Sequence, residues 1–352
     1  MSSSPALFPA FWGNAAAQAM LHQLLASGRI PQTLLFEGPS GVGKATLARR
    51  FASALLGRPD RIEQDDLSLA PNQEIVADRE KWTADKRNDE PLYFATHPDF
   101  VTFPPDGPLR QLSIPQMRRL RELAAYQPLS GSRRVFLIDH IDRANEQAAN
   151  SLLKTLEEPP PYLILILTAE NAYDLLPTIR SRSVPVRLAP LSPAEMQDFL
   201  ATRADLDQRP RRMALAQGSP GTAISIDIAG YDRRRQAMLT LLEVSARATP
   251  FGSWIKYSES LGASKSEKLD DYLAVLAALL EDLLLVAHGV PAGRNADLEP
   301  QLRALAKRVN FPWIREALHK TNDLASLVRR NIQKSLALDA MAIQLSRLAP
   351  GS

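Results

Sequence analysis

The feature that most constrains this chain is a glycine-rich run between a short apolar segment and a helical one. The run Gly38-Pro39-Ser40-Gly41-Val42-Gly43-Lys44 fits the phosphate-binding pattern G-x-x-x-x-G-K. Thr33–Glu37 before it predicts a strand, and Lys44–Leu56 after it predicts a helix that ends at Gly57. Glycines let successive N–H groups turn towards one phosphate, and the helix N-terminus favours the same anion. A nucleotide-binding loop is therefore favoured over a tight turn that merely matches the pattern.

Two positions depart from an active nucleotide site. An active loop has Ser or Thr after its lysine, because that hydroxyl binds Mg²⁺, but this chain has Ala45. The hydroxyl of Thr46, one residue on, is turned about 100° away. A second apolar run ends in the carboxylate of Asp139, and His140 follows where a Glu often acts as base. Loss of the base is a simpler interpretation than replacement by His140. The candidate nucleotide-binding residues are Gly38, Gly41, Gly43, Lys44, Thr46 and Asp139. We expect ATP or ADP to bind weakly at most and to be hydrolysed poorly.

Short apolar runs alternate with helical periodicity through the first two thirds of the chain. The further runs rich in β-formers are Asp99–Phe103, Val135–Asp139, Leu163–Thr168 and Val184–Leu188. The helical stretches among them are Ala15–Ala26, Ile114–Ala125 and Ala144–Leu156. Such alternation predicts an α/β fold with a mostly parallel sheet covered on both faces. After Pro190 the pattern becomes helical, starting with Pro193–Thr202 behind the expected capping box of Ser192 and Glu195.

Composition excludes several classes of protein. The 42 basic and 39 acidic residues leave a net charge of +3, so a strongly basic nucleic-acid coat is excluded, whereas a local basic patch is not. The absence of cysteine removes disulfides and zinc–thiolate sites, and the five scattered histidines predict no other metal site. Residues 58–96 are polar, charged and interrupted by three prolines, so we expect a surface insertion with little regular structure.

Two observations bear on location. The most apolar stretch, Tyr272–Val290, is interrupted by Glu281, Asp282 and His288, which favours a buried helix over a membrane span. Met1–Pro5 lacks the basic and apolar regions of a signal peptide. We therefore expect a cytoplasmic protein that makes no membrane contact.

Four motifs carry a resemblance to a known family. The run Asn150–Pro160 (NSLLKTLEEPP) closely resembles a segment of bacterial clamp-loader subunits of the AAA+ ATPase family. Arg180-Ser181-Arg182-Ser183 resembles the Ser-Arg-Cys motif of that family, with Ser183 in place of the cysteine. His97-Pro98-Asp99-Phe100 and Gly218-Ser219-Pro220-Gly221 resemble the segment before its second strand and the turn of its small domain. The match extends over roughly residues 10–225.

The resemblance implies three domains in a five-membered ring of different subunits. These would be an AAA+ α/β domain over residues 1–190, a small helical lid over 191–230 and a helical collar over 231–352. The family has motor subunits and a non-motor, delta-prime type. Ala45, His140 and Gly221, which stands where motor subunits have an arginine, favour the non-motor type. The zinc module that relatives carry is missing, and residues 58–96 occupy its place.

The resemblance also implies a catalytic role for Arg182 in trans, as an arginine finger for the ATP of a neighbouring subunit. An ordinary surface cation is the alternative. Implied partners are motor subunits, a delta-like subunit, the sliding clamp and primed DNA, reached through the complex. The chain would belong to the DNA polymerase III holoenzyme without ATPase activity of its own. An active motor subunit and a nucleotide-binding adaptor without turnover remain open alternatives. For Glu157 and Glu158, a structural or interface role is preferred over an acid–base pair.

Overall fold

The computed structural model describes Phe8 and residues 11–203, 205–263, 267–327 and 333–350. Met1–Pro5, which entered the expectation about location, lies outside these residues. Backbone contacts divide the chain into two compact units, residues 1–206 with 218–222 and residues 207–217 with 223–352. The predicted boundaries at 190 and 230 do not coincide with this division. The three-part arrangement therefore stays a prediction, and each unit is described by itself.

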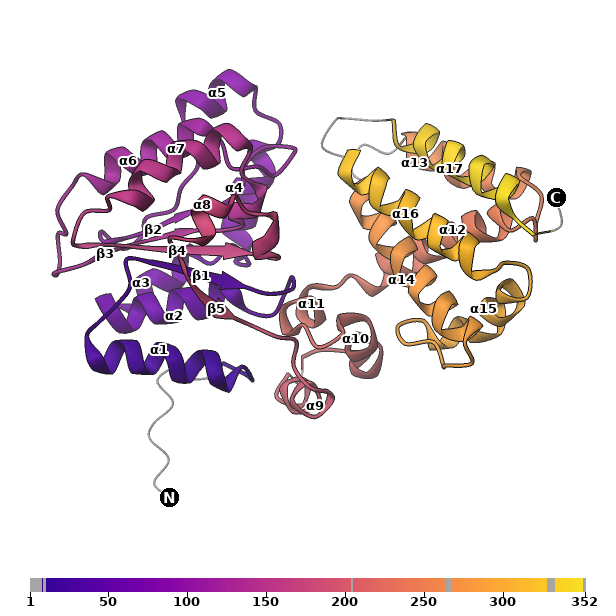
Figure 1. Ribbon diagram of the computed structural model, residues 1–352, viewed down its shortest axis with the longest axis horizontal. Coiled ribbons are helices and arrows are strands. Elements are labelled where there is room, and N and C mark those ends of the chain that lie inside the picture. Colours follow the sequence, from indigo (N-terminus) through magenta and orange to yellow (C-terminus); the bar gives the residue numbers. More distant parts are fainter. Residues whose placement is uncertain (1–7, 9–10, 204, 264–266, 328–332, 351–352) are drawn as a thin grey trace. The chain divides into compact units, whose positions relative to one another are not determined.

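The first unit is built on a five-stranded parallel sheet with the strand order β2-β3-β4-β1-β5 (Figure 1). The strands are β1 (Thr33–Glu37), β2 (Phe100–Phe103), β3 (Arg134–Ile138), β4 (Leu163–Ala169) and β5 (Val184–Arg187). All seven residues of β4 are buried, as expected of a central parallel strand covered on both faces. The parallel sheet that the apolar runs predicted is confirmed.

Helices cover both faces of this sheet (Figure 1). On one face α1 (Ala15–Ser27) and α2 (Lys44–Leu56) pack against Leu34 and Phe36 of β1. On the other, α6 (Ile114–Ala124) and α7 (Glu146–Glu157) pack in the cluster that contains Leu35. Successive side chains of a strand point to opposite faces, so one apolar strand serves both cores. The short η2 (Ile141–Arg143), η3 (Ala172–Asp174) and α8 (Pro177–Arg180) complete the connections.

The insertion over residues 58–96 is helical, so the expectation of little regular structure was wrong. It contains α3 (Pro59–Ile62), η1 (Glu63–Asp65), α4 (Ala70–Arg79) and α5 (Ala84–Asp89). Pro59 and Pro71 lie in the first turns of their helices, where the missing N–H has no cost. Some charged side chains of the insertion form ion pairs with the rest of the first unit. Buried Arg49 of α2 pairs with Glu63 and Asp66, and Arg79 Nη2 lies 2.7 Å from Asp106 Oδ2. Ion pairing with the body of the unit thus orders this polar segment.

After β5 the described residues form helices and turns only. Ser192 and Glu195 form the predicted capping box at α9. The elements are α9 (Pro193–Ala201), α10 (Arg209–Ala216), α11 (Pro220–Ser225), α12 (Ile228–Ser245), α13 (Gly252–Ala263), α14 (Leu269–Ala287), η4 (Ala296–Leu298), α15 (Glu299–Ala306), α16 (Phe311–Leu327) and α17 (Lys334–Leu348). The Tyr272–Val290 stretch lies mostly in α14, whose apolar face is buried in the core of the second unit as predicted. None of the helices described is both long and apolar enough to cross a membrane.

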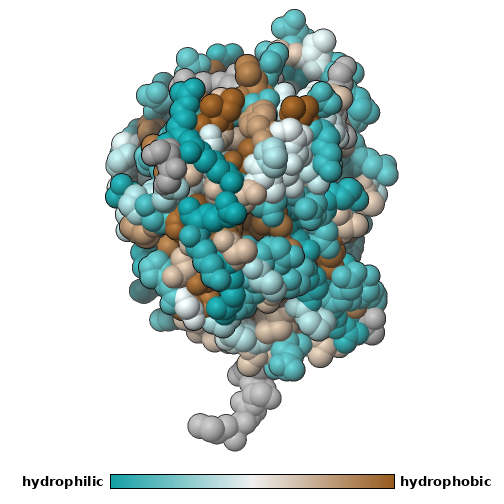
Figure 2. Space-filling model, turned by 90° about the vertical axis from the view of Figure 1, so that its right-hand side faces the viewer, coloured by the Kyte–Doolittle hydropathy of each residue, from teal (hydrophilic) through white to brown (hydrophobic). Residues whose placement is uncertain are grey.

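The surface of the second unit combines polar and apolar side chains. In the space-filling view of Figure 2, brown apolar groups lie between teal hydrophilic ones. The exposed large apolar residues described in this unit are Ile224, Phe251, Ile255, Leu285, Val290, Phe311, Leu336, Ile343 and Leu348. The core beneath contains Trp254, whose indole Nε1 donates to Asp339 Oδ1 at 2.6 Å.

Candidate nucleotide site

The phosphate loop joins β1 to α2 at the carboxyl edge of the sheet. Gly38, Gly41 and Gly43 have φ angles of 148°, 74° and 98°, a region that favours glycine. The Gly38 N–H donates to Ala169 O at the end of β4, at 3.2 Å, which ties the loop to the central strand. The glycine pattern in the sequence therefore corresponds to the backbone that such a loop requires.

Lys44 is turned back onto the loop. Its ammonium donates to the carbonyl oxygens of Gly38 and Pro39 at 2.6 and 2.8 Å, and only 6% of the residue is exposed. Burial lowers the pKa of Lys44 from its usual 10.5, whereas the negative charge of nearby carboxylates opposes this effect. These carboxylates belong to Glu170, Asp139 and Asp142. The ammonium charge of Lys44 thus already interacts with loop carbonyl groups and with neighbouring carboxylates of the same chain.

The two departures seen in the sequence have structural counterparts. The methyl group of Ala45 packs against the same apolar cluster as Phe11 does. Asp139 Oδ1 accepts a hydrogen bond from Thr168 Oγ1 at 2.6 Å, and Thr168 Oγ1 accepts one from the His140 N–H at 2.8 Å. His140 Nδ1 is buried without a hydrogen-bond partner, 3.9 Å from Asp142 Oδ1. Thr46 is half-buried in the first turn of α2.

The loop is also covered by its own chain. The Gly221 N–H donates to Gly41 O at 2.8 Å. A Cβ on Gly41 would lie 2.5 Å from Thr222 Oγ1 and 2.9 Å from Thr222 N. A Cβ on Gly43 would lie 2.9 Å from the ring of Phe11. All these residues belong to the first unit. Gly221, which the resemblance places where motor subunits have an arginine, thus packs its backbone directly on the loop.

The loop lacks the hydroxyl that binds Mg²⁺ in an active nucleotide site. The position next to the lysine is a methyl group in an apolar cluster, and the lysine is bound to loop carbonyls. Among the residues described, no three His, Asp or Glu side chains come together as a metal site.

Arg182 lies between α8 and β5. Its Nη2 is 3.0 Å from Glu157 Oε1 at the end of α7, and its Nη1 donates to Thr178 O at 3.2 Å. About a third of the side chain is exposed, at 36%. The contacts described for Arg182 are with α7 and α8, and none joins it to the phosphate loop. The predicted site residues therefore form two groups, the loop with Asp139 and the separate Arg182.

The His-Pro-Asp motif is structural. Asp99 is fully buried, and its carboxylate accepts the N–H groups of Leu129 and Ser130, each at 2.7 Å. His97 Nδ1 accepts the Asp99 N–H at 3.0 Å. These bonds fix the connection that leads into β3.

Sequence reasoning missed several residues around the site. The hydroxyl of Thr168 contacts Asp139, and the carboxylates of Asp142 and Glu170 lie near Lys44. The only signal in the sequence was Thr168, the polar residue at the end of the predicted apolar run Leu163–Thr168.

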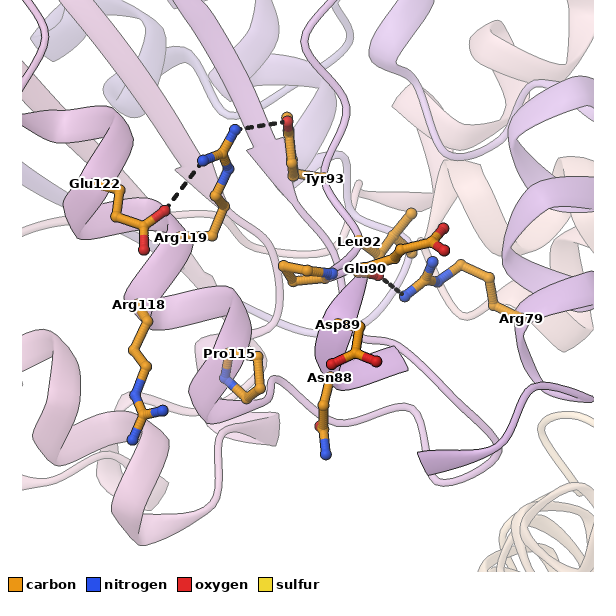
Figure 3. A pocket seen from close by; sticks show the side chains of 11 residues that line it. Arg79, Asn88, Asp89, Glu90, Leu92, Tyr93, Pro115, Arg118, Arg119 and Glu122 are labelled. Carbon is orange, nitrogen blue, oxygen red and sulfur yellow. Dashed lines mark hydrogen bonds and ion pairs between the residues drawn. The ribbon is translucent and has the colours of Figure 1, made fainter. Parts of the chain in front are cut away.

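Sequence reasoning also missed a cleft of about 820 Å³ between the insertion and α6 (Figure 3). There Arg119 donates to Glu122 and to the Tyr93 hydroxyl. The cleft is lined by Arg79, Asn88, Asp89, Glu90, Pro91, Leu92, Tyr93, Pro115, Arg118, Arg119 and Glu122.

The strand order, the glycine loop after β1 and the helical region that follows define a P-loop domain of the AAA+ type. The chain belongs to the family described as "DNA polymerase III, delta subunit", whose model matches residues 13–192.

Relatives with two different subunit names are similar to this chain. The chain is 32% identical over 218 residues to the DNA polymerase III subunit delta' of Escherichia coli, covering 61% of this chain and 63% of that one. It is 33% identical over 205 residues to the subunit gamma/tau of Mycobacterium tuberculosis, covering 56% of this chain and 31% of that protein. The chain thus spans about a third of the mycobacterial relative. A solved gamma subunit-related protein of Thermotoga maritima shows weak similarity, 14% identical with a TM-score of 0.46, covering 93% of this chain and 98% of that one.

Proposed function

We propose that the chain is a non-motor, delta-prime-type subunit of a bacterial clamp loader. It would help to place the sliding clamp on primed DNA, as part of the DNA polymerase III holoenzyme and in the cytoplasm. Family membership and the delta' relatives support a clamp-loader subunit. The relatives include both gamma/tau and delta' proteins. The residues of the nucleotide site therefore have to decide whether the chain is a motor or a non-motor subunit. The methyl group of Ala45 carries that distinction, since it stands where an active loop has the hydroxyl that binds Mg²⁺.

Nucleotide would bind to this chain weakly at most. A phosphate in the loop has to compete with the carbonyl groups of Gly38 and Pro39 for the ammonium of Lys44. The alternative of an ATP-hydrolysing subunit needs a base, and His140 is the candidate. Its Nδ1 is buried near two carboxylates, so only Nε2 is left to accept a proton from an attacking water, and Ala45 still lacks the hydroxyl that binds Mg²⁺. The chain would therefore have no ATPase activity of its own.

The positive contribution to ATP hydrolysis would come from Arg182. Its guanidinium is one-third exposed at the end of a short helix and already held at two points. A guanidinium presented to the γ-phosphate of a neighbouring subunit stabilises the charge of the transition state, which raises kcat about 10³–10⁵-fold in known cases. Partners would be gamma/tau-type ATPase subunits and a delta-like subunit in a ring of five, with clamp and DNA contacted through that complex.

The test measures ATP turnover with clamp and primed DNA present. The samples are the chain alone, the reconstituted loader, and loaders that carry Arg182→Ala or the control Arg180→Ala. Arg180 precedes Arg182 by two residues and lies over the ring of Tyr173 at 4.9 Å. We expect no turnover from the chain alone, loss of turnover at one neighbouring site with Arg182→Ala, and normal turnover with Arg180→Ala.

Two results would contradict this proposal. Robust turnover by the isolated chain would make it a motor subunit despite Ala45. Equal turnover with Arg182→Ala and Arg180→Ala would make Arg182 an ordinary surface cation and reduce the role of the subunit to scaffolding. Stabilisation of the isolated chain by Mg²⁺–ATP in thermal unfolding would separately show that the loop opens to nucleotide.

A further inference from the structure

Helix α7 ends in two neighbouring carboxylates, Glu157 and Glu158. Both residues are exposed. The carboxyl end of a helix carries partial negative charge, so acidic side chains are disfavoured there unless a cation compensates them. For Glu157 that cation is Arg182, at 3.0 Å. The proposed function does not account for this carboxylate.

The guanidinium of Arg182 is held from two elements. Glu157 of α7 contacts Nη2, and the carbonyl of Thr178 in α8 accepts from Nη1 at 3.2 Å. Two anchors on different elements restrict both the position and the rotation of a planar group. An arginine has five N–H donors, so a guanidinium held in this way still has donors for a third group.

We propose that Glu157 is a positioning residue for Arg182, which holds the guanidinium in a fixed place before the nucleotide of a neighbouring subunit meets it. This inference rests on the proposed function of Arg182. The physical reason is preorganisation: a free arginine side chain has many rotamers, and restricting them during the reaction opposes transition-state binding. Immobilising one such side chain in advance is worth about 2- to 10-fold in rate. Glu157 contacts no reacting atom and acts through Arg182 alone.

Glu158 provides a matched control. It is the next residue, carries the same charge at the same helix end, and is similarly exposed. The described contacts of Arg182 include Glu157 but not Glu158. Replacing either glutamate by glutamine removes one charge with little change in size, so a general electrostatic effect would appear in both variants.

The experiment uses the reconstituted loader with clamp and primed DNA. It compares Glu157→Gln, Glu158→Gln, Arg182→Ala and the double variant Glu157→Gln/Arg182→Ala. We expect Glu157→Gln to lower kcat for ATP about 2- to 10-fold at the site that Arg182 serves, with KM unchanged. Glu158→Gln should leave both values unchanged. In the Arg182→Ala background, Glu157→Gln should have no further effect. Thermal unfolding of each variant checks the fold, which an exposed ion pair stabilises little.

The outcomes separate this inference from the proposed function. If Arg182→Ala leaves turnover unchanged, the proposed function fails, and the positioning role fails with it. If Arg182→Ala lowers turnover but Glu157→Gln equals Glu158→Gln or raises kcat, only the positioning role is overturned. The same holds if the effect of Glu157→Gln persists in the Arg182→Ala background, because Glu157 would then act through the fold.

Discussion

Replacing Gly41 with alanine tests the contact between the phosphate loop and the segment at Gly221. Gly41 has a φ of 74°, and the new Cβ would lie 2.5 Å from Thr222 Oγ1 and 2.9 Å from Thr222 N. The hydroxyl can rotate away, but the backbone nitrogen has to shift. Gly28→Ala is the control, since Gly28 has a φ of 66° with no atom within 4 Å of the new Cβ. Both variants place alanine in a left-handed backbone conformation and lose free energy of folding for that reason. Only Gly41→Ala also brings the new Cβ too close to Thr222.

The magnitudes follow from these two terms. A left-handed conformation costs a non-glycine residue about 1–2 kcal/mol. Overpacking against a backbone that must move costs about 1–3 kcal/mol more. In a domain of this size 1 kcal/mol corresponds to roughly 2–4 °C in Tm. Gly41→Ala should therefore unfold roughly 2–12 °C below Gly28→Ala.

Calorimetry measures the Tm of both variants, and hydrogen exchange follows the Gly221 amide that donates to Gly41 O. We expect faster exchange of this amide in Gly41→Ala and an unchanged rate in Gly28→Ala. Equal Tm values together with unchanged protection of the Gly221 amide would refute the reasoning, because the contact would then not hold this segment on the loop.

Two further predictions concern the insertion. Asp106→Ala leaves buried Arg79 unpaired and should lower the free energy of unfolding by about 3–5 kcal/mol in urea denaturation, whereas exposed Asp60→Ala should cause no measurable change; similar midpoints would contradict this. Burial raises the pKa of Asp65 above its usual 3.8, so this group favours folding fully only below that pH and loses the contribution as pH rises through the folded pKa. Asp65→Asn should therefore raise Tm at neutral pH, and this increase in Tm should shrink in acid. An increase in Tm that does not depend on pH would show that the raised pKa of Asp65 is not its cause.

Much of the first unit was predictable because local patterns specify its elements. Buried parallel strands are continuous apolar runs, and the runs at β1, β3 and β4 were long enough to recognise. The capping box of Ser192 and Glu195 marked the start of α9 for a local reason, since its bonds join residues three apart. Parallel pairing followed from the alternation with helices.

The insertion was misjudged because charge was taken as a sign of exposure. Arg49 is 2% exposed, and the Arg79 and Asp106 side chains are 6% and 5% exposed. A buried charge needs a partner of opposite charge, which here comes from another segment. Local composition does not show whether such a partner is present. Prolines at helix starts were likewise mistaken for breaks.

For the candidate site, the sequence by itself determined which groups are present: a glycine loop, a methyl group where a magnesium ligand belongs, and an arginine in a recognisable motif. Only the tertiary structure decided what each group contacts. Gly221 lies on Gly41, Thr168 binds Asp139, and Glu157 holds Arg182. These partners are far apart in the chain and meet because of how the strands are ordered and how the connections return to the sheet. Spacing along a chain specifies local geometry, whereas the choice between distant partners depends on packing.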